Sequence, residues 1–145
     1  MASNADIVRE YHTRLWAQGD LSAVEDYWLP TAEVHMTGFD GNGIEVVKAD
    51  VERYFKAFSD VETQINHLVT EGDTVVLHWT TSGLHVGTYD DIPATQKRIT
   101  MTGIDLLRLS EGRFAECWSM WDGLSVYEQL GVLKLERPSP SEPSE

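Results

Sequence analysis

Cysteine is nearly absent from this sequence: its 145 residues include only Cys117. A single thiol excludes an intramolecular disulfide and a cysteine-based zinc site. The chain also lacks the run of about 20 apolar residues that a membrane-spanning helix needs. Its first residues, MASNADIVREYH, have no basic segment followed by an apolar one, so no signal peptide is predicted. We therefore expect a soluble protein of the cytoplasm.

Basic residues are scarce as well, with 11 Lys and Arg against 24 Asp and Glu and a net charge of −13. Such a surface repels nucleic-acid phosphates and anionic lipids, so neither nucleic acid nor membrane is an expected partner. A hydrophobic content of 41% is sufficient for a folded core. We expect one domain over residues 1–133 and a disordered tail rich in Pro, Ser and Glu over residues 134–145.

Several motifs that carry chemistry are missing. The sequence contains no HExxH or His-x-His pair, no phosphate-binding GxGxxG or GxxxxGK[ST] loop and no Gly-x-Ser-x-Gly elbow. These absences predict no metal site and no nucleotide cofactor, and they give no support to a serine nucleophile.

The spacing of apolar residues predicts an α+β fold. It indicates helices over residues 4–18, 21–28, 44–59 and 125–130, and strands over residues 32–37, 62–70, 74–86, 99–109 and 113–121. Asn42 and Glu45 form a candidate capping box for the third helix. The segments 38–43 and 87–97 are predicted loops, the second too polar to be buried. A curved sheet with helices across its concave side would enclose a cone-shaped cavity.

The stretch ECWSMWD, residues 116–122, ends the last strand with one unusual face. Alternation puts Glu116, Trp118, Met120 and Asp122 on that face, opposite the face with Cys117, Ser119 and Trp121. If the first face lines the cavity, a carboxyl at its apolar wall suits a general acid or base. The alternative is that Asp122 caps the following helix. Glu116 fits either a cavity wall or a solvated strand end.

Two histidines are further candidates for the site. His35 shares a strand face with Thr37, which fits either a lined cavity or an exposed rim. His78 lies deep in a long strand, on the face of Thr80, and fits either ligand contact or a core position. Among the other histidines, we expect His12 and His67 at the surface and His85 in a structural or gating role.

Five tryptophans are many for a chain of this length, and they indicate either core filling or a stacking wall for a planar ligand. The side chains predicted to contact substrate are His78, Thr80, Trp118, Met120, Thr102, Ile104, Trp16 and Phe39.

From His85 onward the sequence resembles the SnoaL-like polyketide cyclases of the NTF2-like superfamily. The stretch LHVGTYDDIPATQKRITMTGIDLLRLSEGRFAECWSMWD, followed by QLG, matches a family pattern of Gly-x-His-x-Gly, Thr-Gly-x-Asp and Glu-x-Trp-x-x-x-Asp. The similarity spans about residues 5 to 131. Two positions differ from the family. Leu84 stands where the family often has Gly or Thr, and PATQK replaces the usual Pro-Pro-Thr-Gly-Lys. Both lie in the loop at the expected cavity mouth, so they concern substrate fit more than fold.

The resemblance implies an NTF2-like cone: a curved, mixed or antiparallel sheet with three N-terminal helices over it. It implies cofactor-independent aldol closure of a polyketide ring, with Asp122 as the acid/base and His35 as a pocket residue beside it. The implied substrate is hydrophobic and polycyclic, the setting antibiotic or other secondary metabolism, and the assembly a homodimer or homotetramer through the sheet.

Other members of the superfamily imply alternatives. A SnoaL-like hydroxylase or isomerase and a non-catalytic binding or dimerisation module all remain open. Limonene epoxide hydrolases carry an Arg-x-Asp pair where this chain has His78 and Thr80, so epoxide hydrolysis is disfavoured.

Overall fold

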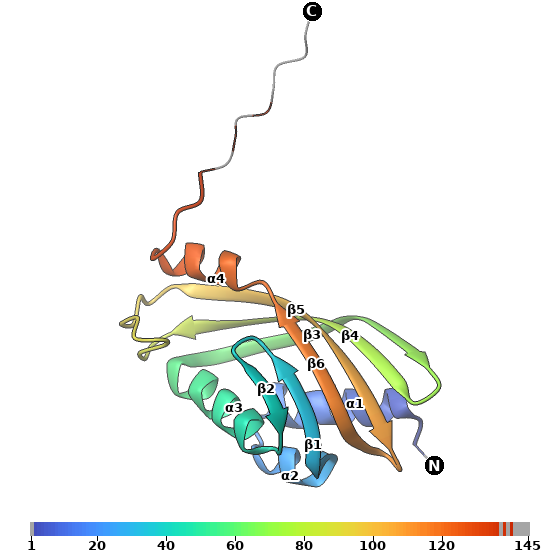
Figure 1. The fold of residues 1–145 in the computed structure, drawn as a ribbon. Coiled ribbons are helices and arrows are strands. Elements are labelled where there is room, and N and C mark those ends of the chain that lie inside the picture. Colours follow the sequence, from blue (N-terminus) through green and yellow to red (C-terminus); the bar gives the residue numbers. More distant parts are fainter. Residues whose placement is uncertain (1, 137, 139, 141–145) are drawn as a thin grey trace, which may run out of the picture.

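A curved sheet of six strands, covered on one face by helices, makes up the fold (Figure 1). The computed structural model describes residues 2–136, 138 and 140. The N-terminal helical segments are α1 (Asn4–His12) and its π-helical continuation η1 (Thr13–Ala17), α2 (Ser22–Tyr27) and α3 (Glu45–Ala57). They confirm the three helices predicted before residue 60.

The first helix begins with a capping box that uses Ser3 and Asp6. The Asp6 amide donates to Ser3 Oγ at 3.1 Å, and the Ser3 amide donates to Asp6 Oδ2 at 3.3 Å. The capping box predicted for α3 is wrong: Ile44 is its N-cap residue and makes no side-chain cap bond. Asn42 instead pairs in the sheet opposite Glu33, which keeps it away from the helix.

The sheet is mixed, in the order β2-β1-β6-β5-β4-β3. Its strands are β1 (Trp28–Met36), β2 (Phe39–Asn42), β3 (Phe58–Glu71), β4 (Thr74–His85), β5 (Arg98–Ser110) and β6 (Arg113–Trp121). Strand β1 runs parallel to β6, while every other neighbouring pair is antiparallel. All five predicted strands are confirmed. The predicted loop 38–43 proved to contain β2, which turns back on β1 through Gly38 at φ 82°.

The inner face of the sheet and the helices share the hydrophobic core. Val75 and Leu77 of β4 and Leu107 of β5 are buried against Val8 of α1 and Val51 of α3. Strand residues of the opposite parity point to the outer face, which none of the helices in the described residues covers (Figure 1). The predicted α+β class, with helices over a curved mixed sheet, is confirmed.

The segment between β4 and β5 is less exposed than its polar composition predicted. Tyr89 is only 5% exposed and packs against Phe58, so the expectation that this loop is too polar to be buried is wrong there. The last helix, α4 (Gly123–Leu130), begins two residues before the predicted position and ends at Gly131, whose φ of 84° suits glycine. The predicted disordered tail lies largely outside the described residues.

None of the helices in the described part of the chain has both the length and the apolar character to span a membrane.

One glycine on the inner face has no space for a side chain. A Cβ at Gly103 would lie 2.4 Å from the Trp79 ring and 2.7 Å from the Met120 carbonyl oxygen. We expect Gly103→Ala to lower the free energy of unfolding by about 1–3 kcal/mol through overpacking. At Gly123 the nearest atoms are 3.6 Å away, so Gly123→Ala should change it by less than about 1 kcal/mol. Urea unfolding of both variants checks this, and equal losses would contradict it.

Candidate active site

A cavity of about 240 Å³ lies between the helices and the inner face of the sheet. The helical segments α1, η1, α3 and α4 and strands β1, β4, β5 and β6 contribute to its wall, as does the segment after β4. The lining residues are His12, Trp16, Met36, Thr37, Asp50, Arg53, Tyr54, Trp79, Thr81, Tyr89, Asp90, Met101, Asp105, Ser119, Trp121 and Tyr127. Six of them carry Trp or Tyr rings, which suits a flat, largely apolar ligand.

Asp105 is the acid of the sheet-side wall. It lies in β5 directly opposite Ser119 of β6, whose hydroxyl donates to Asp105 Oδ1 at 2.7 Å. Burial raises the pKa of Asp105 to about 6, and the Ser119 hydrogen bond offsets part of that rise. The Trp79 indole also lowers the pKa of Asp105, although its Nε1 is not in regular hydrogen-bond geometry with the carboxyl. A carboxyl with this pKa can both accept and donate a proton near neutral pH.

His12 borders the same cavity in a neutral form. Its side chain is buried, contrary to the prediction of a surface position, and burial lowers its pKa to about 4. Its Nε2 lies 2.8 Å from Thr63 Oγ1, which in turn lies 2.8 Å from Thr81 Oγ1 at the cavity wall. This chain of neutral groups lets the wall hydrogen-bond a ligand without adding a charge.

The remaining charges of the cavity form a network around Arg53, which is 48% exposed. Arg53 binds Asp50 at 2.7 Å and Asp90 at 2.9 Å, and the Tyr127 hydroxyl donates to Asp90 at 2.6 Å. Asp90 thereby ties the segment after β4 to both α3 and α4. Burial raises the pKa of Asp50, while the Arg53 charge opposes the rise. These partners occupy the charged groups and leave Asp105 as the acid without a basic partner in the cavity.

His85 ties the two ends of that segment together. Its backbone and Nδ1 bond Lys97, Gln96 and Thr95, and the Thr95 amide donates to Nδ1 at 3.1 Å. An amide can only donate, so Nδ1 accepts and the ring proton sits on Nε2. The contacts agree with the structural role predicted for His85.

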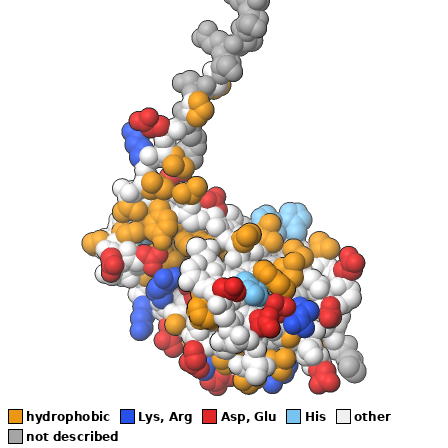
Figure 2. All heavy atoms as spheres, viewed as in Figure 1, with side chains coloured by type: hydrophobic (Ala, Val, Ile, Leu, Met, Phe, Trp, Pro, Cys, Tyr) orange, Lys and Arg blue, Asp and Glu red, His pale blue; other side chains and the backbone are white. Residues whose placement is uncertain are grey.

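The face predicted to line the cavity is the outer face of the sheet. Trp118 is 40% exposed and Met120 75% exposed, because the parity that turns Ser119 and Trp121 inward turns these residues outward. Four more predicted substrate contacts, His78, Thr80, Thr102 and Ile104, also have outward parity. This face therefore does not line the enclosed cavity. It borders an open groove instead, whose lining includes His78, Thr102, Ile104, Trp118, Met120 and Asp122, and substrate contact there stays a prediction. On the side of the molecule in Figure 2, hydrophobic side chains are interrupted by histidine and acidic groups.

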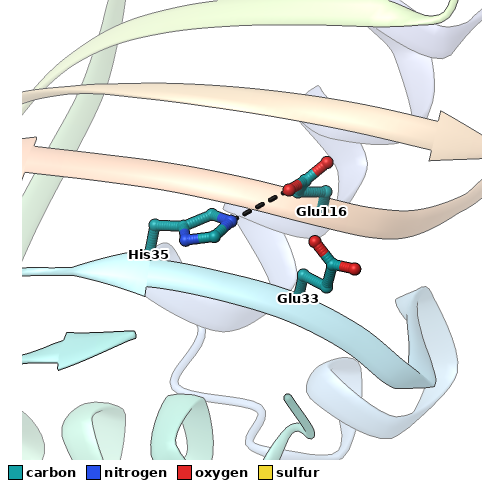
Figure 3. A group of neighbouring side chains, drawn as sticks. All are labelled: Glu33, His35 and Glu116. Atoms are coloured by element: carbon teal, nitrogen blue, oxygen red, sulfur yellow. Dashed lines mark hydrogen bonds and ion pairs between the residues drawn. The ribbon is translucent and has the colours of Figure 1, made fainter. Parts of the chain in front are cut away.

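Asp122 and His35 lie outside the cavity too. Asp122 is exposed and caps α4, accepting from the Ser125 amide at 3.1 Å, which is the alternative that its position before a helix indicated. His35 stacks on Trp118 at a centroid distance of 5.0 Å and places Nε2 2.9 Å from Glu116 Oε2. Figure 3 shows this imidazole beside Glu33 and Glu116 on neighbouring strands. The structure thus separates the two predicted catalytic groups from the enclosed cavity.

The last two predicted substrate contacts lie in different places. Trp16 lines the cavity as expected, whereas Phe39 packs against the core. His67 is exposed, as predicted, and pairs with His78 across β3 and β4, their Nδ1 atoms 3.0 Å apart.

Asp105 and Ser119 were absent from the predicted site. A signal for Asp105 was present in MTGIDLLRL, where it is the lone acid on a face otherwise made of Met101, Gly103, Leu107 and Leu109. A carboxyl on the most apolar face of a strand indicates burial, and unpaired buried acids are rare outside functional sites. Ser119 had no signal of its own, because only the register of β5 with β6 places it beside Asp105.

The fold is that of the NTF2-like proteins. A structure of an NTF2-like protein from Burkholderia thailandensis superposes with a TM-score of 0.72 at 18% identity, over 90% of this chain and 98% of that chain. TsrD from Streptomyces laurentii gives 0.80 at 28% identity, over 90% and 96% of the two chains. A candidate polyketide cyclase from Acidithiobacillus ferrooxidans gives 0.78 at 29% identity, also over 90% and 96%.

The family follows from the sequence. The model of the SnoaL-like polyketide cyclase family matches residues 6–130, so the chain belongs to that family. AclR from Streptomyces galilaeus, described as a candidate hydroxylase, shares the fold with a TM-score of 0.82 at 24% identity, over 90% of this chain and 97% of that chain. By sequence, no curated protein matches.

The raised pKa of Asp105 makes stability depend on pH. Its native value of about 6 exceeds the ordinary 3.8, so the native state holds the proton more tightly and loses stability as pH rises through that interval. Asp105→Asn removes this cost. We therefore expect the free energy of unfolding of the variant, relative to that of the wild type, to rise by about 1–3 kcal/mol from pH 4 to pH 7. Urea unfolding at both pH values measures the gain, and a difference that is independent of pH would contradict the assignment.

Proposed function

We propose that this protein catalyses an intramolecular aldol-type ring closure of a polyketide or related polycyclic intermediate, with Asp105 as general acid and base. The observation that carries the proposal is the single unpaired carboxyl in an aromatic cavity, with a pKa of about 6. Membership of the SnoaL-like polyketide cyclase family supports the reaction class. The Trp and Tyr rings of the wall support a hydrophobic substrate with a planar ring system.

The reaction uses one group twice. Ionised Asp105 removes a proton from a carbon between two carbonyl groups, and the resulting enolate carbon attacks another carbonyl carbon of the same molecule. A carbon–carbon bond forms, the attacked carbonyl becomes an alkoxide, and Asp105 returns its proton to that oxygen. The product has the same atoms as the substrate, and these steps require no redox partner or organic cofactor.

The cavity contributes by position and by polarity. Holding the two reacting carbons of the substrate close together removes the entropic cost of finding that arrangement among its conformers. The Ser119 hydroxyl orients the Asp105 carboxyl through its hydrogen bond of 2.7 Å. Tyr54 also lines the cavity, and its hydroxyl is buried without a hydrogen-bond partner among the described residues.

Asp105→Asn tests the catalytic assignment. The amide keeps the size of the side chain but cannot take up a proton, so we expect kcat to fall by about 10²- to 10⁴-fold. The assay follows ring closure of aromatic polyketide esters that carry an acidic methylene and an internal carbonyl acceptor. Quenching of tryptophan fluorescence measures binding, which should be retained in the variant.

Asp122→Asn is the matched control. Asparagine caps a helix about as well as aspartate, so α4 should remain intact and kcat should stay within about threefold of the wild type. A large loss in Asp122→Asn with full activity in Asp105→Asn would restore the original prediction of Asp122 as the acid/base. Binding without turnover by the wild type would instead identify a non-catalytic module.

We also infer that the outer face pairs two copies of the chain, inside a cell that makes secondary metabolites. The support is its exposed apolar side chains, with Ile104 at 51% and Met120 at 75% exposure. Met120→Glu should shift the mass measured by light scattering towards the monomer. Leu21→Glu, at a residue 38% exposed before α2, should leave the mass unchanged. A wild type that is monomeric at high concentration would overturn the inference.

A further inference from the structure

Three metal-ligating side chains meet on the outer face, away from the cavity. Glu33 and His35 are two residues apart in β1 and therefore share a face, and Glu116 lies in the neighbouring parallel strand β6. The register pairs Glu33 directly with Glu116 and His35 with Trp118. Figure 3 shows the two carboxylates and the imidazole turned toward one another. None of the three borders the cavity that contains Asp105.

The ligand atoms are spaced closely enough to share one ion. One carboxylate oxygen from each glutamate and one imidazole nitrogen all lie within 4.8 Å of one another. Ligands held about 2.0–2.2 Å from a tetrahedral Zn²⁺ ion lie about 3.3–3.6 Å apart, so side-chain rotations would have to bring the three atoms about 1 Å closer together. Glu33 is exposed, while Glu116 retains only 14% exposure of its side chain.

The groups around the cluster hold it in a ligating arrangement. Asp40 of β2 bonds Nδ1 of His35, which leaves Nε2 as the nitrogen directed at the glutamates. A carboxylate on the second ring nitrogen is the usual support of a metal-bound histidine. Trp118 stacks on the imidazole with an interplanar angle of 20°, which restricts rotation of the ring. Arg108 binds Oε1 of Glu116 at 3.3 Å and leaves Oε2 turned to His35.

Three carboxylates, those of Glu33, Asp40 and Glu116, surround the His35 ring. Like charges directly opposite on neighbouring strands are destabilising, and Glu33 faces Glu116 in that relation. Arg108 binds Glu116 through Oε1, while Oε2 of Glu116 faces His35. An ion bound by both carboxylates and Nε2 would remove the repulsion and keep the Asp40 and Arg108 contacts.

We propose that Glu33, His35 and Glu116 form a binding site for a divalent transition-metal ion, with Zn²⁺ as the fitting case. Two carboxylate oxygens and one imidazole nitrogen suit Zn²⁺, whose remaining position water would complete. Three protein ligands that include a nitrogen are too few and of the wrong type for Ca²⁺ or Mg²⁺. The site lies on the outer face of the sheet and takes no part in the chemistry of the cavity.

Calorimetric titration of the chelator-treated, full-length protein with ZnCl₂ tests the proposal. We expect one tight Zn²⁺ ion per chain, with no comparable binding of MgCl₂. His35→Asn and Glu33→Gln should each abolish the tight event. Asp40→Asn, which removes only the support of the ring, should weaken it by at least about tenfold. Circular dichroism of each variant establishes that the fold is retained.

The exposed pair of His67 and His78 supplies the matched control, since two imidazoles with Nδ1 atoms 3.0 Å apart can also capture zinc. His67→Asn should leave the tight event unchanged. Loss of binding in His67→Asn with retention in His35→Asn would overturn the proposal, as would a wild type that binds no Zn²⁺ at millimolar concentration. Ring-closing activity should be the same in His35→Asn and the wild type, which separates this site from Asp105.

Discussion

The register that pairs Asp105 of β5 with Ser119 of β6 is the constraint on which the site depends. It turns both side chains to the concave side, where the helices exclude water and raise the pKa of the carboxyl. The same alternation sends Ile104, Trp118 and Met120 to the other side. A shift of one residue would exchange the two sets and leave the cavity without an acid.

The two faces of the sheet consequently have different chemistry. The concave face has one unpaired acid among rings, with the charges of Asp50, Arg53 and Asp90 bound to one another. The convex face carries exposed apolar side chains next to a compact group of His and Glu ligands (Figure 3). One surface suits proton transfer in a largely enclosed cavity, and the other suits contacts with ions and a second chain.

The sequence predicted the helices and strands better than it predicted which face of the sheet lines the cavity. The strand 113–121 and the helix over residues 44–59 follow from periodicity, because local backbone preference and the apolar stripe agree there. The short strand β2 has no such stripe, and only its pairing with β1 stabilises it. For ECWSMWD, both faces contain aromatic and polar groups, so alternation correctly separated Trp118 from Trp121 but could not tell which one faces the helices. Trp16 lines the cavity, and it lies in a helix whose apolar residues recur at helical spacing, so its direction depends less on the pairing of strands.

The sequence by itself determined the class of fold, the family and the alternation of every strand, since these depend on local spacing and on motifs such as Thr-Gly-x-Asp. Tertiary structure decided which side of the sheet is enclosed, because desolvation arises from helices that are distant in the chain. It moved the proposed acid from Asp122, a helix cap, to Asp105, a carboxyl within the wall. It also brought Glu33 and Glu116 together from positions 83 residues apart, through a parallel strand pair that no local pattern reveals.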